Sequence, residues 1–382
     1  FPTRRSSDLE SRAKIDKIDK EIASLFEERM KVATDVAAYK RSTGKKVFDP
    51  AREEEKIHAL RELTQDEFNK TGIEDLFRQI MSISRKYQYK VLGSETNEIL
   101  PFKQVDKLDV DKDTRIVCFG EHGAYTEQAM EEVFGTDITS MNRLSFKEVL
   151  ETVANGEAKY GVIPIENTST GGINDTYDLL LDYDITIVAE HVVKVEQALL
   201  GKPGAKVSDI KKVYSHPQGI MQCSKFIKEH NMESESYMST SSAAKKVAEE
   251  DDISQGAIAS TRAAKIFGLD VLEESINFES SNYTRFIIVT NQKVFLSNAN
   301  KISLSFEIKH QAGALYNMLS NFYYNDLNLT KIESRPIENR NWEYQFFVDI
   351  EGNLNDPGVR NALACIRECA KELTILGNVR TK

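Results

Sequence analysis

The chain has 382 residues, which is long enough for two or three domains that each bury a core. Its net charge of −10 argues against nucleic acid as the main partner, because phosphate binding requires a basic surface. No apolar run approaches the roughly 20 residues that a membrane helix needs. The four cysteines form no metal or disulfide pattern, so we expect a soluble cytoplasmic enzyme without a metal.

The first expected element is a long helix from Glu10 to about Arg41. Residues 1–9 lack an initiator Met and are basic and Ser-rich, so we interpret them as carry-over sequence and leave them out. Apolar residues recur along the helix at steps of three and four, and this stripe contains Ile15, Ile18, Ile22, Leu25, Val32 and Val36. Arg12, Arg29 and Lys40 fall on the same stripe. One such cation could extend its head group into water, but three favour an anion-binding site.

The spacing of these cations predicts a dimer. Arg12 and Lys40 are 28 residues apart in the sequence. One straight helix therefore separates them by about 42 Å, at 1.5 Å per residue. No small molecule bridges that span, so Arg12 must serve a site that belongs to a second chain.

Two further helices complete an all-α module without strands. Asp49 followed by Pro50 is typical of a helix start, and this short helix should run to about Leu63. A third helix is expected from about Thr71, with Ser84 and Gln88 one turn apart. Residues 95–112 are polar and charged and are expected to be a linker.

An α/β pattern follows the linker, with strands expected at 115–119, 160–165, 185–189, 212–214, 257–259 and 285–290. In the stretch 161–181, Pro164 is typical of a strand end, and Glu166 and Asn167 should lie where the strand stops. A turn at 168–172 should open a helix with Ile173, Tyr177, Leu180 and Leu181 on one side. That turn is either an anion site or an ordinary strand–turn–helix connection.

The remaining segments contain a motif around His216 and a last module of different pattern. His216 either caps a helix or belongs to a site. Apolar residues alternate at 302–308 and 342–350, and helices are expected near 312–324 and 356–372. Together these elements predict the order βαββαβ.

The motifs resemble those of bifunctional chorismate mutase–prephenate dehydratases, over residues 10 to 380. The run from Ile165 to Leu180 is similar to the long dehydratase signature, and the first three helices are similar to the helical chorismate mutase domain. The resemblance implies an all-α mutase domain at 10–94, which forms an intertwined dimer, and a dehydratase domain at 113–294. The dehydratase should have two α/β lobes, similar in fold to periplasmic binding proteins. A βαββαβ ACT regulatory domain is expected at 299–382.

For the mutase, the resemblance implies a site that binds the chorismate dianion, with Lys40 and Gln88 at the breaking ether oxygen and Glu53 at the substrate hydroxyl. Arg12 would come from the partner chain. The other positions that match the family are Arg29, Asp49, Arg52 and Ser84. The rearrangement needs no cofactor, because the site has only to bind the compact conformer and stabilise growing charge.

For the dehydratase, the resemblance implies loss of the ring hydroxyl and carbon dioxide from prephenate, which gives phenylpyruvate. Thr284 is expected near the departing hydroxyl, as a hydrogen-bond donor. Its expected neighbours are Glu166, Asn167, Ser215, His216, Gln222 and Arg285.

Two motifs of the last module resemble the phenylalanine site of ACT domains, and imply feedback inhibition by L-phenylalanine in a homodimer or dimer of dimers. They comprise Gly313, Ala314 and Leu315, and Glu333, Ser334, Arg335 and Pro336. One alternative is a dehydratase of the same fold that prefers arogenate. The other is a non-catalytic amino-acid sensor, and the intact charged set of the helical module argues against it.

Overall fold

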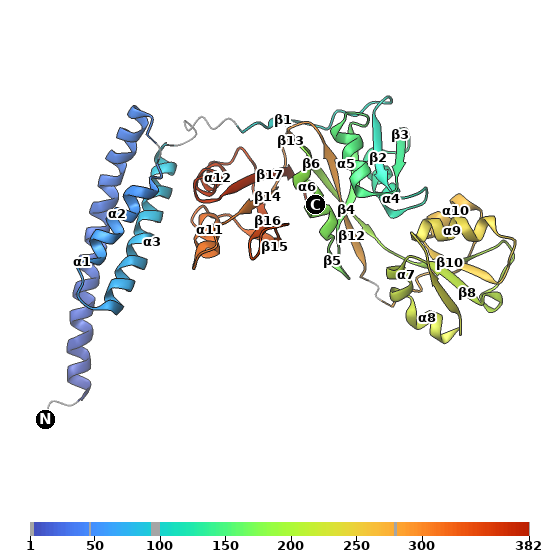
Figure 1. Ribbon diagram of the computed structural model, residues 1–382, viewed down its shortest axis with the longest axis horizontal. Coiled ribbons are helices and arrows are strands. Elements are labelled where there is room, and N and C mark those ends of the chain that lie inside the picture. Colours follow the sequence, from blue (N-terminus) through green and yellow to red (C-terminus); the bar gives the residue numbers. More distant parts are fainter. Residues whose placement is uncertain (1–3, 46, 93–99, 279–280, 382) are drawn as a thin grey trace. The chain divides into compact units, whose positions relative to one another are not determined.

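The computed structural model describes residues 4–45, 47–92, 100–278 and 281–381, and its elements are labelled in Figure 1. The chain falls into two compact units. The first combines residues 1–99 with 307–328 and 354–373. The second combines 100–306 with 329–353 and 374–382. The last module expected from the sequence thus contributes residues to both units.

The first unit is helical throughout its described N-terminal part, as predicted. It contains α1 (Arg4–Thr43), α2 (Pro50–Arg61), α3 (Glu67–Leu92), α11 (Ala314–Tyr323) and α12 (Pro357–Cys369). Helix α1 is unbroken, and it begins within the residues that we left out as carry-over. Asp49 caps α2 as predicted, since its side chain accepts a hydrogen bond from the backbone N–H of Arg52 at 3.2 Å.

The apolar stripe of α1 is exposed in this single chain, although such a stripe is normally buried. The exposed fractions of its members run from 39% to 64%, for Ile15, Ile18, Ile22, Leu25, Val32 and Val36. Among the residues of α1 whose side chains are described, the buried ones are instead the small Ala33 and Ala37. The stripe therefore remains available for a partner.

The larger lobe of the second unit is a sheet in which the dehydratase strands take the order β6-β12-β4-β2-β3. These strands are β2 (Arg115–Phe119), β3 (Thr139–Arg143), β4 (Tyr160–Asn167), β6 (Thr186–Lys194) and β12 (Tyr283–Thr290). Helices α4 (Tyr125–Phe134), α5 (Phe146–Ala154) and α6 (Asn174–Asp182) accompany them. Apolar clusters lie on both faces of this sheet, one with Ile163 and Ile287 and the other with Val162 and Ile288.

The smaller lobe is a second sheet that the chain enters after β6 and leaves before β12, so the predicted two-lobed α/β architecture is present. Its strand order is β11-β7-β10-β8-β9. The strands are β7 (Ala198–Gly201), β8 (Lys212–Ser215), β9 (Glu233–Ser236), β10 (Gln255–Ala259) and β11 (Asp270–Glu273). The helices are α7 (Pro217–Gln222), α8 (Ser224–Glu229), α9 (Thr240–Glu249) and α10 (Thr261–Phe267).

The C-terminal elements follow the predicted order βαββαβ. Their strands are β14 (Lys301–Glu307), β15 (Leu329–Pro336), β16 (Tyr344–Glu351) and β17 (Glu372–Val379), arranged as β15-β16-β14-β17. Both strands expected from the alternation are present, and β14 is buried at every position. Trp342, which was expected in the second strand, lies outside β16 and is 77% exposed. Part of the expected linker is also ordered, because β1 (Lys103–Val105) pairs with β13 (Val294–Leu296); residues 95–99 lie outside the described residues.

In the stretch 161–181 the strand ends where predicted, and two other points depart from prediction. Strand β4 runs through Pro164 and ends at Glu166 and Asn167, after a bulge in which Ile165 has no partner on β12. Gly171 and Gly172 of the expected turn form the short strand β5, before α6 begins at Asn174. Leu181 is 39% exposed, whereas Tyr177 and Leu180 of the same helix are buried as predicted.

Candidate functional site

The helical module encloses a cavity of about 590 Å³ that is lined from α1, α2 and α3. Seven of the eight side chains that were predicted for the mutase site line it: Arg29, Lys40, Asp49, Arg52, Glu53, Ser84 and Gln88. Local structure explains the convergence. The Asp49 cap fixes the first turn of α2, so Arg52 and Glu53 follow at once. On α3, Ser84 and Gln88 are four residues apart and share one face.

Polar atoms in this cavity are incompletely satisfied by the chain itself. Lys40 Nζ donates to the carbonyl of Val47 at 2.5 Å, and Gln88 Nε2 donates to Ser84 Oγ at 3.3 Å. Within the described residues, Gln88 Oε1 and Arg29 Nη1 are buried and have no hydrogen-bond partner. Because an unpaired buried polar atom is costly, these two atoms indicate where a ligand would bind.

Two cations of the cavity, Lys40 and Arg29, are held in an environment that disfavours their charge. Burial lowers the pKa of Lys40, and the neighbouring Arg52 lowers it further, while Glu53 and Asp49 oppose this. Burial also lowers the pKa of Arg29. A bound anion would relieve both costs, which is the electrostatic signature of an anion site.

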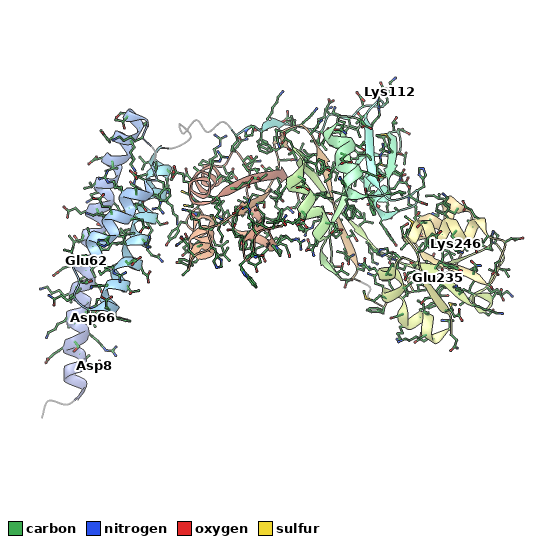
Figure 2. The ribbon with its side chains drawn as sticks, viewed as in Figure 1. Asp8, Glu62, Asp66, Lys112, Glu235 and Lys246 are labelled. Atoms are coloured by element: carbon green, nitrogen blue, oxygen red, sulfur yellow. The ribbon has the colours of Figure 1, made fainter. Side chains whose placement is uncertain are left out.

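Arg12 is the predicted mutase residue that does not line this cavity. Its side chain is 71% exposed and its Nε pairs with Asp8 at 2.9 Å. Figure 2 labels Asp8 near the N-terminal end of α1. The helix between Arg12 and Lys40 is continuous, as the spacing argument required.

Sequence reasoning missed Arg85, which also lines the cavity. Its Nη1 forms an ion pair with Glu53 Oε2, and its guanidinium stacks over the ring of Phe48 at 4.7 Å from the centroid. Arg85 lies outside the charged stripe of the first helix, and the resemblance did not include it. Its position directly after Ser84 was the only sequence signal.

In the dehydratase lobes, the pairing of β4 with β12 brings Asn167 opposite Thr284. Asn167 Nδ2 donates to Thr284 Oγ1 at 2.9 Å and to Asn282 Oδ1 at 2.8 Å. Thr284 is 9% exposed. Because the amide donates into its oxygen, the Thr284 hydroxyl can direct its own proton elsewhere, as a donor near a departing group must.

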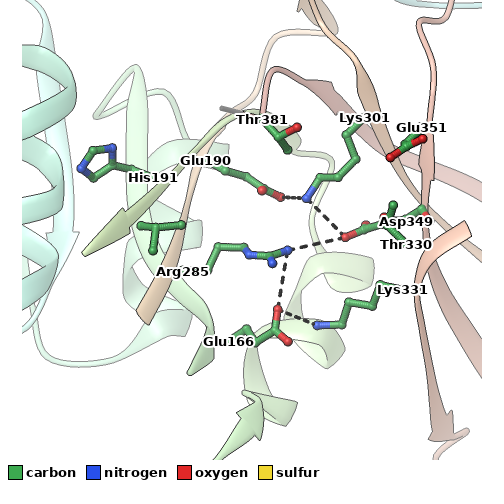
Figure 3. A pocket seen from close by; sticks show the side chains of 11 residues that line it. Glu166, Glu190, His191, Arg285, Lys301, Thr330, Lys331, Asp349, Glu351 and Thr381 are labelled. Atoms are coloured by element: carbon green, nitrogen blue, oxygen red, sulfur yellow. Dashed lines mark hydrogen bonds and ion pairs between the residues drawn. The ribbon is translucent and has the colours of Figure 1, made fainter. Parts of the chain in front are cut away.

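Glu166 and Arg285 are also opposite each other, but on the other face of the same strands. They line a cavity of about 440 Å³, shown in Figure 3. Arg285 lies 3.6 Å from Glu166 and 3.9 Å from Asp349 of β16, and Lys331 of β15 lies 3.2 Å from Glu166. The predicted dehydratase set is therefore divided between two faces of the sheet.

The other predicted dehydratase residues lie in the smaller lobe, from the end of β8 to the end of α7. Ser215 is fully buried, and its hydroxyl donates to the carbonyl of Ile258 at 2.6 Å. His216 caps α7, since its Nδ1 accepts from the N–H of Gln218. Gln222 is 4% exposed. Gln218, which was not predicted, extends its amide to within 3.5 Å of Asn167 Oδ1.

The two motifs predicted for the effector lie in different units. Gly313 is the N-cap of α11 with φ of 74°, a left-handed conformation, and Ala314 and Leu315 begin the helix. Glu333, Ser334, Arg335 and Pro336 end β15. Arg335 Nη2 pairs with Asp178 of α6 at 2.6 Å.

The described residues contain neither a candidate membrane span nor a candidate metal cluster. None of their helices combines the length and apolar character that crossing a membrane requires. No group of three or more His, Cys, Asp or Glu side chains in the described chain is arranged to hold a metal ion.

Comparison with known proteins matches this geometry in both halves of the chain. The family description "Chorismate mutase type II" matches residues 11–89, and "Prephenate dehydratase" matches residues 116–294. A bifunctional chorismate mutase/prephenate dehydratase of Aquifex aeolicus (strain VF5) is 31% identical, over 97% of this chain and 96% of its own length.

Solved structures match about 70% of the chain. A prephenate dehydratase from Arthrobacter aurescens, in complex with L-Phe, has a TM-score of 0.66 at 30% identity, over 70% of this chain and 90% of its own. GqqA, described as a quorum quenching acylase, has a TM-score of 0.65 at 28% identity, over 70% of this chain and 98% of its own. From the helical cavity, the two α/β lobes and the full-length relative, we conclude that the chain belongs to the bifunctional chorismate mutase/prephenate dehydratase family.

Proposed function

We propose that the helical cavity converts chorismate to prephenate and that the dehydratase lobes convert prephenate to phenylpyruvate, with loss of water and carbon dioxide. The two reactions are consecutive steps toward phenylalanine. The observation that carries the proposal is the convergence of Arg29, Lys40 and Arg52 on one cavity, together with the unsatisfied Gln88 Oε1. We assign residues 10–94 to the mutase, 95–112 to a linker, 113–294 to the dehydratase and 299–382 to an ACT domain.

In the mutase reaction, the two carboxylates of chorismate are bound by arginines, which suit carboxylates because their fork donates two hydrogen bonds. Arg29 and Arg52 supply this grip, with Asp49 and Ser84 beside them. Lys40 and Gln88 donate to the ether oxygen, where negative charge grows as the bond breaks. Glu53 accepts a hydrogen bond from the substrate hydroxyl. No proton is transferred and no covalent intermediate forms.

We propose that the mutase site is completed by Arg12 of a second copy of this chain. Two observations support this: Arg12 lies outside the cavity of its own chain, and the apolar stripe of α1 is exposed. Association of two α1 stripes would bury those side chains and bring each Arg12 to the partner's cavity. The assembly is a homodimer or a dimer of dimers.

In the dehydratase reaction, Thr284 donates a hydrogen bond to the departing hydroxyl and Asn167 orients Thr284 through the 2.9 Å hydrogen bond. Ser215, His216 and Gln222 approach from the smaller lobe. Glu166 and Arg285 belong to this proposed set through the strands that they share with Asn167 and Thr284. Aromatisation of the ring drives the loss of carbon dioxide, so no cofactor is required.

We propose that L-phenylalanine inhibits the enzyme through the C-terminal βαββαβ module. The complex of the Arthrobacter aurescens relative with L-Phe supports a site for this amino acid in the part of the chain that the two proteins share. Residues Gly313–Leu315 and Glu333–Pro336 are the proposed binding segments. We expect the enzyme in the cytoplasm, where its relatives' biosynthetic role would place it.

A coupled assay tests the proposal as a whole. The purified protein should form phenylpyruvate from chorismate alone, and L-phenylalanine should reduce that rate. Prephenate and arogenate are compared as dehydratase substrates in parallel, and we expect a preference for prephenate. A protein that binds phenylalanine but converts neither chorismate nor prephenate would be an amino-acid sensor, and would refute the enzyme assignment.

A further inference from the structure

The ion pair between Arg85 and Glu53 joins α3 to α2 at the wall of the mutase cavity. Arg85 Nη1 contacts Glu53 Oε2, and the side chains are only 16% and 24% exposed. The guanidinium is also held from its face by the ring of Phe48, at 4.7 Å from the centroid. Arg85 is thus fixed both by a charge and by an aromatic contact.

This contact restrains Glu53, the proposed partner of the substrate hydroxyl. A glutamate side chain has three rotatable torsions, so an unrestrained Glu53 would sample many positions, and ordering it on substrate binding would cost entropy. Arg85 engages Oε2 and leaves Oε1 to accept a hydrogen bond. It also compensates the negative charge of Glu53, which would otherwise repel a dianionic substrate.

Building on the mutase function proposed above, we propose that Arg85 is a positioning residue for chorismate rearrangement. It holds Glu53 with one carboxylate oxygen directed to the substrate hydroxyl, and it does not itself bind the substrate carboxylates. A productive site requires its groups to be held within a fraction of an ångström, which a second layer of contacts normally provides.

The alternative role is a simple clasp between two helices, and the chain contains a matched control for it. Arg78 of α3 pairs with Glu54 of α2, at 2.6 Å from Nη1 to Oε1 and 3.1 Å from Nη2 to Oε2. This pair joins the same two helices and uses the same residue types. It does not line the cavity, and its side chains are 39% and 63% exposed.

The experiment compares Arg85→Met with Arg78→Met in the full-length chain. Each variant is assayed for mutase kcat and KM, for dehydration of supplied prephenate, and for thermal unfolding. We expect Arg85→Met to lower mutase kcat/KM by about 10- to 100-fold, the cost of misplacing a group in a site. Arg78→Met should change it by less than about threefold, as expected of an exposed ion pair. Dehydration should be unchanged in both.

A double-mutant cycle distinguishes positioning from direct substrate binding. If Arg85 acts through Glu53, the double variant should have a mutase kcat/KM within about threefold of that of Glu53→Gln alone. An undiminished loss in that background would mean that Arg85 contacts the substrate itself, and would overturn the proposal. Equal losses of mutase kcat/KM in Arg85→Met and Arg78→Met would mean that Arg85 only joins two helices, and would also overturn the proposal.

Arg85→Lys covers the case in which Arg85→Met does not fold. Lysine keeps a positive charge beside the Glu53 carboxylate but has no planar group to stack on Phe48. We therefore expect an intermediate loss of mutase kcat/KM with an unchanged unfolding temperature. If the Arg85→Lys variant folds and keeps full mutase activity, and so does Arg85→Met where it folds, Arg85 is not a positioning residue. Absence of mutase activity in the unsubstituted chain would instead refute the proposed function, so the two failures can be told apart.

Discussion

In the helical cavity the proposed catalytic side chains are long and, apart from Gln88, charged, and they extend from three separate helices. At the Asn167–Thr284 pair they are short and neutral, and they are joined to each other across adjacent strands. The first arrangement leaves polar atoms unsatisfied, and one of its predicted members lies outside the cavity. The second is already organised within one chain. Long charged side chains therefore need a ligand and a partner to be fixed, whereas short paired ones are fixed by the sheet.

The sharpest way to break this comparison is to remove one member from each site. Lys40→Ala should lower prephenate formation by about 10²- to 10³-fold, the usual cost of a lost transition-state donor, and leave dehydration of supplied prephenate near normal. Thr284→Ala should do the reverse. Lys31→Ala, on an exposed face of α1, is the control. A large loss of both activities in either folded variant would show that the two sites are not independent.

A smaller but more specific effect is expected from mixing two inactive mutase variants. Arg12→Ala and Lys40→Ala chains in a heterodimer would leave one of its two sites with both unsubstituted residues. With random exchange about a quarter of all sites would be intact, so about a quarter of mutase activity should return. Mass spectrometry confirms subunit exchange. If heterodimers form and activity stays absent, Arg12 does not serve the partner's site.

The pH dependence of the two activities should also differ. Burial and Arg52 lower the pKa of Lys40, so it loses its proton at a lower pH than an ordinary lysine. Mutase activity should therefore fall as pH rises through that lowered pKa, by about tenfold per pH unit beyond it. Dehydration of prephenate should not follow this curve. The Lys40→Gln variant has a neutral side chain, so its lower mutase activity should not fall at alkaline pH. If the activity of this variant still falls at alkaline pH, another group is responsible for the titration.

The smallest effect on catalysis is expected at Gly313. Valine there would be strained, because φ is 74°, and would occupy space beside the proposed effector segment. We expect Gly313→Val to keep both activities but to lose phenylalanine binding and inhibition, measured by calorimetric titration beside a dehydratase assay. Gly268→Val is the matched control, since Gly268 has φ of 69° and an added Cβ there would meet no atom within 4 Å. Unchanged inhibition in a folded Gly313→Val protein would place the effector site elsewhere.

The helical site was the more predictable of the two, for a physical reason. Helical period relates residues three and four apart, so Arg29, Lys40, Ser84 and Gln88 could be assigned to faces from spacing alone. The exposure of the apolar stripe was not predictable from one chain, because periodicity shows which side is apolar but not what covers it. Arg85 was missed because its partner Glu53 lies 32 residues away on another helix.

The sheet site was predictable in membership but not in geometry. Resemblance brought Glu166, Asn167, Thr284 and Arg285 together as one set. The strands divide them, because neighbouring residues on a strand point to opposite faces. Which pair shares a face depends on the register of β4 with β12, and that register changes at Ile165. A bulge is a property of two paired strands, and neither strand alone reveals it.

The bulge at Ile165 determines which of two neighbouring residues of β4 lies opposite Thr284. Because Ile165 is the residue without a partner on β12, loss of its codon would restore regular pairing and leave Asn167 opposite Thr284 and Glu166 opposite Arg285. Regular pairing that kept Ile165 in the ladder would instead bring Glu166 opposite Thr284, where its carboxylate would repel the dianionic prephenate. A comparison of genomes by residue identity alone would not register whether the bulge is kept, although the bulge decides which of the two residues reaches Thr284.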